Sequence, residues 1–328
     1  MAREITEKIS TVVDEALNGG KIKHLAIDEA ESLVTLIVEV PFGTDEKQLS
    51  RQLARIIKLD LGYKGLKLSV DTKTTKQPEK VAKTKYITIT SGKGGVGKST
   101  VAGNLAAALG RLGNKIGIID ADIYGPSLPK LFGIANPELQ MDSNNKIIPV
   151  PAEDNVSIIS TEFLTEDDMP LMWRGPMLSR MLGHFFEDVL WGENYDYILI
   201  DLPPGTGDVP IDIKNFIPNA KAIVVTTPNQ MASRIAVKSG LMAKHLGHEV
   251  LGVVENMSYF TNPVNGSNEY IFGSGGGESV AKSLDTEVLA EIPICQVKDG
   301  HRSGIFATHE ENGLAYLGLA NKIMKKFG

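Results

Sequence analysis

The sequence contains a single cysteine and no long apolar run. Because Cys295 stands alone among the 328 residues, the chain cannot form an internal disulfide or, by itself, a cysteine-rich metal site. One thiol is typical of a reducing compartment, and we expect a cytoplasmic protein. No eighteen consecutive residues are apolar, which excludes a membrane-spanning helix. The N-terminal stretch MAREITEKIS lacks the apolar centre of a signal peptide, so we expect none.

An excess of charge of one sign is also missing. Lys and Arg total 34, Asp and Glu total 40, and the formal net charge is −6. A mildly acidic chain is not typical of a dedicated nucleic-acid binder, so we do not expect nucleic acid as a partner, although a local basic patch stays possible. The length suits one large domain with a small one, or two medium domains.

A polar stretch separates two regions that each have a complete hydrophobic pattern. Residues 71–85 (DTKTTKQPEKVAKTK) are rich in Lys and Thr and show no hydrophobic period, which predicts a linker at 73–84. A long surface loop within one domain is the alternative. We predict a small α+β domain at 1–72 and a larger domain at 85–328.

The region before the linker alternates helical and strand patterns. Apolar residues recur at helical spacing from Ile5 to Val13. Strands are predicted at 22–27, 33–40 and 66–70, with a second helix at 48–57 between the last two. The order α-β-β-α-β predicts a compact module, and we find no catalytic constellation in it.

After the linker, seven short apolar runs alternate with helical stretches. Most are β-branched and apolar on both faces, which is typical of parallel strands covered by helices on both sides. They lie at residues 86–90, 116–119, 156–159, 197–200, 222–226, 250–254 and 288–292. The predicted fold is α/β, an open doubly wound and mostly parallel sheet.

A glycine-rich loop follows the first of these strands. Residues 92–99 fit G-x-x-x-x-G-K-[ST] and a helical pattern follows them, which indicates a phosphate-binding loop. Backbone N–H groups and the helix N-terminus would bind phosphate oxygens. Lys98 would reach the β- and γ-phosphates, and the Ser99 hydroxyl would hold Mg²⁺. The predicted ATP-binding residues in the loop are Gly92, Lys93, Gly94, Gly95, Val96, Gly97, Lys98, Ser99 and Thr100.

The same loop also fits a second pattern, the dinucleotide fingerprint G-x-G-x-x-G. Gly92, Gly94 and Gly97 occupy its glycine positions, and Asp120 follows about twenty residues later. That fingerprint has no role for a lysine at position 98. A second acidic strand end, at Asp201, argues further against it.

Two later strands end in carboxylates. Asp201 closes the run at 197–200, and we predict that it holds Mg²⁺ together with Ser99. The Pro-Pro-Gly-Thr-Gly turn after Asp201 would respond to the γ-phosphate. Asp122 is the candidate for orienting the attacking water, so the predicted catalytic residues are Lys93, Lys98 and Asp122. Asp120 would support the Mg²⁺ shell or the loop, and a capping or turn role is the alternative for both carboxylates.

Several separated motifs resemble one family. Lys93 in GKGGVGKST resembles the signature lysine of the deviant P-loop ATPases, the MinD/ParA-like class. The motifs DADIYGPS, WRGPM, DLPPGTGD, ENMSYF and FGSGGG are similar to those of the Mrp/ApbC iron–sulfur cluster carriers. The resemblance implies a homodimer holding two nucleotides, with Lys93 reaching the partner's phosphates and Asn256 reading the adenine. It also implies slow ATP hydrolysis, and a [4Fe-4S] cluster passed to apoprotein clients or received from iron–sulfur assembly proteins.

One motif departs from that family's pattern. Where the family has Cys-Pro-x-Cys, this chain reads Asn262-Pro263-Val264-Asn265. A carboxamide cannot replace a soft thiolate on iron, so we predict no iron–sulfur ligands here. We expect Cys295 to be a small buried hydrophobe. The alternative function is a cluster-free ATP-dependent switch that binds DNA or a partner protein, and a MinD-like membrane-cycling ATPase is a third.

Two further segments are expected to make contacts. The C-terminal residues 314–327 are amphipathic, and we expect a helix packed on the sheet, with a membrane-binding tail as the alternative. Methionines gather around Trp173, which predicts a contribution to the dimer interface, with core packing or an adaptable partner-binding face as alternatives. These methionines are Met169, Met172, Met177 and Met181.

Overall fold

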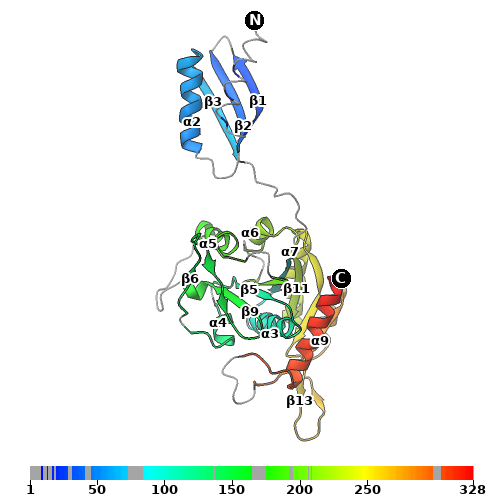
Figure 1. Cartoon of the computed structure of the whole chain (residues 1–328). Coiled ribbons are helices and arrows are strands. Elements are labelled where there is room, and N and C mark those ends of the chain that lie inside the picture. The colour runs from blue at the N-terminus through cyan, green and yellow to red at the C-terminus, as the bar shows by residue number, and fades with distance from the viewer. Residues whose placement is uncertain are drawn as a thin grey trace. The chain divides into compact units, whose positions relative to one another are not determined.

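A computed structural model describes residues 9, 13, 17, 20–28, 32–40, 46–72, 84–123, 125–135, 137–164, 175–191, 195–205, 207, 209–297 and 304–327. The chain forms two compact units, Met1–Val81 and Ala82–Gly328 (Figure 1). Of the predicted linker, residues 73–83 lie outside the described residues. Thr84 is described, and its hydroxyl donates to the Tyr195 carbonyl at 2.8 Å.

The small unit is a three-stranded sheet packed against a helix. Strand β1 (Lys21–Asp28) runs antiparallel to β2 (Leu33–Val40), and β2 runs parallel to β3 (Gly65–Thr72). Helix α2 (Glu46–Arg55), extended by the π-turn η1 (Ile56–Asp60), connects β2 to β3. Alternate side chains of β2 are fully buried, because one face of the strand covers the core. The three predicted strands are confirmed, whereas most of the first predicted helix lies outside the described residues.

The large unit is built on an eight-stranded sheet with the order β15-β12-β11-β4-β10-β5-β9-β8. Every neighbouring pair is parallel except β8 and β9. The strands are β4 (Lys85–Ser91), β5 (Ile116–Asp120), β8 (Val150–Pro151), β9 (Val156–Ser160), β10 (Tyr197–Asp201), β11 (Lys221–Thr226), β12 (Glu249–Asn256) and β15 (Val288–Ile292). All seven predicted strands are confirmed. The edge strand β8 was not predicted because two residues give no hydrophobic run.

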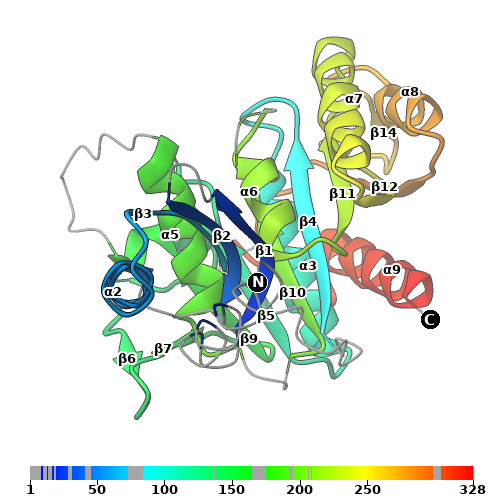
Figure 2. The same cartoon turned by 90° about the horizontal axis from the view of Figure 1, so that it is seen from above.

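Helices cover both faces of this sheet, as the turned view shows (Figure 2). One face carries α3 (Lys98–Arg111), α4 (Leu128–Leu131) and α9 (Glu311–Lys326). The other carries α5 (Gly175–Glu187), α6 (Val209–Phe216), α7 (Gln230–His245) and α8 (Gly276–Ser283). Side chains alternate along each strand, so Ile87 and Ile89 pack on the α3 side while Ile198 and Ile200 pack under α5 and α6. The predicted doubly wound α/β fold is therefore confirmed.

Short elements complete the large unit. These are the hairpin strands β6 (Gln140–Met141), β7 (Ile147–Ile148), β13 (Phe260–Thr261) and β14 (Asn268–Glu269), and the 3₁₀ turn η2 (Thr161–Leu164). The predicted C-terminal helix is confirmed as α9, which buries Tyr316, Leu319 and Ile323 beside α3. Within the described part of the chain, every helix is too short or too polar to cross a lipid bilayer.

The predicted methionine cluster is described only in part. Met169, Met172 and Trp173 lie outside the described residues, as does the side chain of Met177. Met181, on α5, is 6% exposed and belongs to the core under α5 and α6. Met181 is therefore packed in the core, whereas the contribution of Trp173 to a dimer interface stays a prediction.

Candidate nucleotide-binding site

The glycine-rich loop leaves the carboxyl end of β4, near the middle of the sheet. Strand β4 lies between β11 and β10, and β5 lies on the far side of β10. Because the carboxyl ends of parallel strands meet at one edge, the loop lies beside the ends of β10 and β5. The register pairs Asp201 with Ile89 on one side and with Asp120 on the other. The sheet therefore brings the predicted carboxylates to the loop.

The loop glycines have two different physical roles. Gly95 and Gly97 have φ of 80° and 81°, a conformation that costs glycine little. A Cβ on Gly95 would meet nothing within 4 Å, so this side of the loop is open. By contrast, a Cβ on Gly92 would lie 2.3 Å from the carbonyl carbon of Ile235, and one on Gly97 would lie 2.1 Å from Asn256 Nδ2. The loop therefore packs closely against α7 and β12 on one side, while the side at Gly95 is open and forms a cradle.

Lys98 is the centre of a buried charge cluster under this cradle. Its Nζ lies 2.6 Å from Asp201 Oδ1 and 3.4 Å from Asp122 Oδ2. It also donates to the Ser99 hydroxyl at 3.4 Å. Lys98 is 6% exposed and Asp201 is completely buried. Four residues from three separate motifs therefore meet at one point.

Asp201 is incompletely satisfied in this arrangement. Its Oδ2 is buried and makes no hydrogen bond within the described residues. Burial raises the pKa of Asp201, while the charge and hydrogen bond of Lys98 oppose that rise. A buried carboxylate with a vacant lone pair beside a serine hydroxyl suits a hard cation that prefers oxygen ligands. The residues present therefore fit Mg²⁺, and the open glycine cradle above them fits a phosphate chain.

Asp120 shapes the loop after β5 rather than facing the cradle. Its carboxylate accepts backbone N–H groups of Ser127 at 3.0 Å, Leu128 at 3.1 Å and Asp122 at 3.3 Å. Burial, followed by the charge of Asp201, raises the pKa of Asp120 to about 7, and the Leu128 and Ser127 hydrogen bonds oppose that rise. These contacts cap the start of α4 and shape the turn that carries Asp122, which is the alternative role; support of the Mg²⁺ shell or the phosphate loop by Asp120 stays a prediction.

The end of β12 is hydrogen-bonded to the phosphate loop. Asn256 is buried, and its Nδ2 donates to the Val96 carbonyl at 2.9 Å. Its neighbour Glu255 accepts the Ser258 hydroxyl at 2.6 Å and the Gly277 N–H at the start of α8. The contact of Asn256 with adenine stays a prediction. Sequence reasoning assigned no role to Glu255, although this carboxylate follows the apolar run 250–254 and begins the ENMSYF motif.

Lys93 and Thr100 occupy the remaining loop positions. Lys93 is exposed at the tip and makes no ion pair with a described residue, while its carbonyl accepts the Ser91 hydroxyl at 3.2 Å. Thr100 is half-buried at the start of α3. The contact of Lys93 with the phosphates of a partner subunit stays a prediction.

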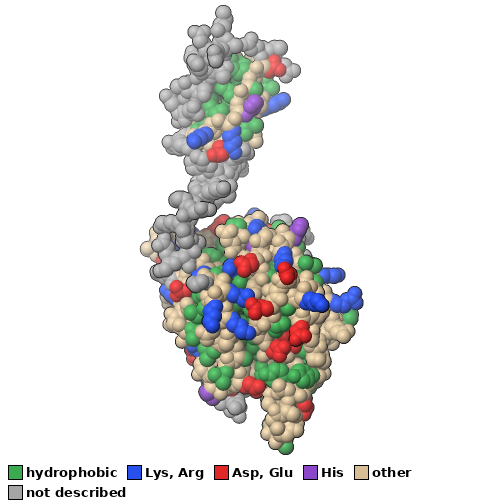
Figure 3. All heavy atoms as spheres, turned by 90° about the vertical axis from the view of Figure 1, so that its right-hand side faces the viewer, with side chains coloured by type: hydrophobic (Ala, Val, Ile, Leu, Met, Phe, Trp, Pro, Cys, Tyr) green, Lys and Arg blue, Asp and Glu red, His purple; other side chains and the backbone are tan. Residues whose placement is uncertain are grey.

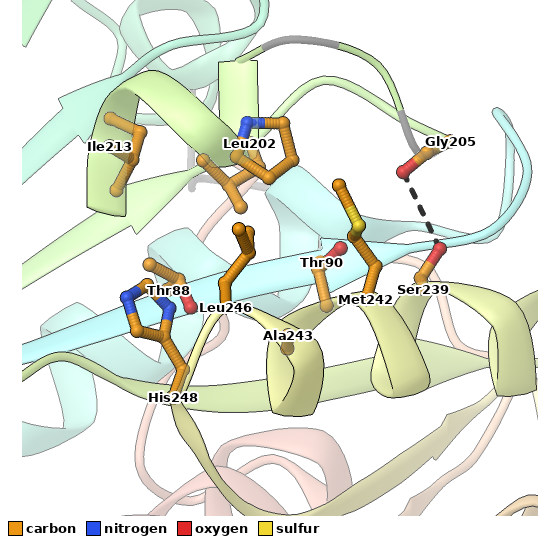
Figure 4. Close-up of a pocket in the computed structure, with 11 residues that line it drawn as sticks. Thr88, Thr90, Leu202, Gly205, Ile213, Ser239, Met242, Ala243, Leu246 and His248 are labelled. Carbon is orange, nitrogen blue, oxygen red and sulfur yellow. Dashed lines mark hydrogen bonds between the residues drawn. The ribbon is translucent and has the colours of Figure 1, made fainter. Parts of the chain in front are cut away.

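A small cavity lies behind the loop, between β4, α6 and α7 (Figure 4). Its volume is about 10 Å³, close to that of one water position. Thr88, Thr90 and His248 line it, and the Ser239 hydroxyl donates to the Gly205 carbonyl at 3.5 Å. That hydrogen bond joins α7 to the turn that follows Asp201. Neither Ser239 nor His248 has a sequence signal, because a lone polar residue on an apolar face also occurs in ordinary cores.

The Asn-Pro-Val-Asn segment forms the turn of the β13–β14 hairpin. Asn262 Oδ1 accepts the Val264 N–H at 2.9 Å, and its Nδ2 donates to Glu269 at 2.7 Å. Asn265 Oδ1 accepts both the N–H and the hydroxyl of Ser267. In Figure 3 the tip projects from the lower end of the large unit, with hydrophobic side chains beside it. Both carboxamides are therefore engaged in shaping the turn.

The expected burial of Cys295 is wrong. The side chain is exposed, and its Sγ donates to the Gln296 carbonyl at 3.3 Å. Strand β15 ends at Ile292, so the chain has already left the sheet when it reaches Cys295. Among the residues that the structure describes, no group of three or more His, Cys, Asp or Glu side chains is placed to hold a metal ion.

Comparison with known proteins gives consistent results. A family model described as ParA, NUBPL iron-transfer P-loop NTPase, matches residues 82–326. An iron-sulfur cluster carrier protein of Bacillus subtilis is 44% identical over 245 residues, which cover 74% of this chain and 68% of the relative. A nucleotide-binding protein from Archaeoglobus fulgidus, solved with ADP, is 34% identical with a TM-score of 0.58, covering 74% of this chain and 90% of that one. The MinD protein from Pyrococcus horikoshii, solved with Mg-ADP, is 25% identical with a TM-score of 0.55, covering 75% and 98%.

Proposed function

Because the chain belongs to the family of NUBPL iron-transfer P-loop NTPases, we propose that it binds and hydrolyses ATP with Mg²⁺ and delivers iron–sulfur clusters to client apoproteins. The observation that carries the nucleotide part is the convergence of Lys98, Asp201 and Asp122 beneath an open glycine cradle. This arrangement supports the proposal that Lys98 binds phosphate, Asp201 holds Mg²⁺ and Asp122 orients the attacking water. The names of the relatives support the delivery of clusters.

The chain's own residues divide the work of hydrolysis. Ser99 and Asp201 would hold Mg²⁺, which supplies charge neutralisation at the phosphates. Lys98, now paired with Asp201, exchanges that partner for the β- and γ-phosphate oxygens when nucleotide enters. Asp122, whose Oδ2 lies 3.4 Å from Lys98 Nζ, would accept a hydrogen bond from the attacking water. The backbone N–H groups of residues 94–98 cradle the phosphates.

A homodimer completes the proposed site. Lys93 is exposed in the phosphate loop, so its side chain can contact the phosphates of a second subunit. Replacing Lys93 by Ala should slow turnover while leaving the affinity of one subunit for ADP within about threefold, because ADP lacks the γ-phosphate. Sedimentation with a non-hydrolysable ATP analogue should show a dimer for the wild type. A monomer under those conditions would exclude the shared site.

The nucleotide part is tested by calorimetry and phosphate release. Wild-type protein should release heat on titration with Mg-ATP, and Lys98→Ala should lose turnover. Lys325→Ala is a matched control, because Lys325 is an exposed lysine near the end of α9. Hydrolysis by Lys98→Ala at the wild-type rate would overturn the assignment. A loss in both variants would instead indicate a general defect of folding.

One observation favours a second candidate function, an ATP-dependent switch that binds a partner protein or DNA and carries no cluster at the hairpin. Asn262 and Asn265 are hydrogen-bonded within the turn, and carboxamides are poor ligands for iron. Anaerobic reconstitution, with iron and sulfide measured per dimer, separates the two functions. It should include the double variant Asn262→Cys, Asn265→Cys and the variant Cys295→Ser.

The outcomes of reconstitution are distinct. A stable stoichiometric cluster on the wild type would establish the carrier, and its loss in Cys295→Ser would locate the ligand. A cluster only on the double cysteine variant would favour the switch. DNA binding that depends on ATP and weakens with salt would then identify DNA as the switch's partner.

A further inference from the structure

A groove runs along the surface between α7 and α8, and no residue of the phosphate loop lines it. Its volume is about 580 Å³. Helix α7 supplies Arg234, Val237 and Lys238 to one wall, while Ser274, Ser279 and Ser283 lie along the other. No Asp or Glu is among the described residues that line it. The groove is thus cationic, in a chain whose net charge is −6.

Arg234 and Lys238 lie one helical turn apart on α7. Both are exposed, and neither makes an ion pair with a described residue. Like charges at this spacing destabilise a helix. Glu278, the acidic residue of α8, is not among the residues that line the groove.

Apolar side chains extend the same face of α7. Met231 is 65% exposed and Leu241 is 51% exposed. Together with Arg234 and Lys238 they follow a spacing of three, four and three residues, so they form one stripe along the helix. Exposed Met and Arg beside a groove are typical of protein–protein interfaces. The stripe therefore has one apolar side chain at each end of a pair of cations.

The α7 wall of the groove is in contact with the nucleotide site. The backbone of Gly92 is packed so closely on Ile235 that a Cβ there would lie 2.3 Å from the Ile235 carbonyl carbon. One turn further, Ser239 donates to Gly205 in the turn after Asp201, as the dashed line in Figure 4 marks. Both contacts come from loops that would surround the phosphates. A displacement of either loop therefore moves α7.

The α8 wall is connected to the same site by a separate route. The Gly277 N–H donates to Glu255, and the adjacent Asn256 donates to the Val96 carbonyl in the phosphate loop. Gly276 meets α7 directly, since a Cβ there would lie 2.6 Å from the Ser233 hydroxyl. Each wall of the groove is thus in contact with a different part of the nucleotide site. The width of the groove depends on how those parts are placed.

We propose that the α7–α8 groove is a docking surface for an acidic segment of a partner protein, and that bound nucleotide sets its affinity. Charge complementarity identifies the occupant: carboxylates pair with Arg234 and Lys238, and apolar side chains contact Met231 and Leu241. Two cations suit a short acidic segment but not nucleic acid, whose affinity grows with the number of neutralised phosphates. The dependence on nucleotide rests on the proposed function, whereas docking itself does not.

The test uses the full chain and a fluorescent peptide of alternating glutamate and leucine, with a lysine–leucine peptide as its control. Fluorescence anisotropy should show that the acidic peptide binds more tightly, and that added salt weakens it. The double variant Arg234→Glu, Lys238→Glu should lose at least about tenfold in affinity, because attraction becomes repulsion. The matched control Lys130→Glu, Lys325→Glu changes the charge equally on the opposite face of the sheet and should bind like the wild type.

Dependence on nucleotide is measured with the same peptide. Its affinity with ADP and with a non-hydrolysable ATP analogue should differ by about fivefold or more. Ser239→Ala should reduce that difference while the peptide still binds. Nucleotide affinity is measured separately by calorimetry. If the protein bound no nucleotide, the proposed function would fail while docking to the apo-protein still stood.

Several outcomes would overturn the proposal. Equal affinity of the wild type and the groove variant, or equal affinity for both peptides, would show that the groove does not select acidic segments. Loss of self-association in the groove variant would assign this face to a second copy of the chain. Binding of anionic lipid vesicles in preference to the peptide would assign it to a membrane.

Discussion

The contact between the phosphate loop and α7 can be tested at two glycines of the same loop. Replacing Gly92 by Ala would add a Cβ 2.3 Å from the Ile235 carbonyl carbon and 2.6 Å from the Ala236 nitrogen. The first distance falls about 1 Å short of ordinary contact, which begins at 3.4 Å. Both neighbours are backbone atoms of a helix, so they cannot move aside as a flexible side chain would.

The expected cost follows from this overpacking. Forcing a methyl group into a well-packed region costs about 1–3 kcal/mol. For a folding unit of this size, each kcal/mol lowers the melting temperature by about 2–4 °C. Gly92→Ala should therefore melt about 2–12 °C below the wild type in the absence of nucleotide. It should also bind ATP more weakly, because α7 or the loop has to shift.

Gly94→Ala is the matched control. The nearest atom to its new Cβ would be Pro204 Cγ at 3.9 Å, which is ordinary contact. Its stability should stay within about 0.5 kcal/mol of the wild type, while its nucleotide affinity falls because the methyl group occupies the open cradle. Thermal unfolding without nucleotide and calorimetry with Mg-ATP measure the two effects. Equal melting temperatures for all three proteins would refute the close contact between the loop and α7.

Three further predictions concern buried polar groups. Lys98→Met removes the counterion of the completely buried Asp201, so urea unfolding without nucleotide should show a loss of about 3 kcal/mol at pH 8. The loss should become smaller as the pH is lowered, because burial raises the pKa of Asp201 and a protonated carboxyl needs no counterion, and a loss that does not change with pH would contradict this. Burial, followed by the charge of Lys214, lowers the pKa of His248, so the folded state binds fewer protons than the unfolded state below about pH 6.5. The wild type should therefore lose stability relative to His248→Gln as the pH falls from there, by at most about 1.4 kcal/mol per pH unit, and parallel unfolding curves would rule that out. The Tyr316 hydroxyl is buried without a hydrogen bond among the described residues, so Tyr316→Phe should leave the melting temperature unchanged or raise it, and a clear decrease would reveal a hidden partner.

The sequence predicted the structure best where residue type and hydrophobic periodicity point to the same element. Buried parallel strands are continuous β-branched runs, so all seven could be predicted to within about two residues. The phosphate loop restricts residue types so strongly that Lys98 and Ser99 could be assigned from spacing. Asp201 and Asp122 followed, because carboxyl ends of parallel strands share an edge.

The unpredicted features depend on contacts between distant segments. Gly92 looks like one more phosphate-binding glycine, yet its contact with α7 is visible only in the folded chain. The groove needs α7 and α8 side by side, and nothing along the sequence pairs them. Cys295 was wrongly expected to be buried, because the apolar residues before it did not reveal that the strand ends at Ile292.

The central position of β4 has a consequence during synthesis. This strand pairs with β10 and β11, as in the contacts of Tyr86 with Ile198 and of Ile87 with Lys221, and both partners are translated more than a hundred residues later. A ribosome-bound intermediate that ends before Thr226 therefore exposes the edges of a β-branched strand, which invites aggregation. Until β10 has emerged, nucleotide cannot assist folding, because Asp201 has not yet formed its ion pair with Lys98. We expect nascent chains of this protein to require chaperone protection until β11 has emerged.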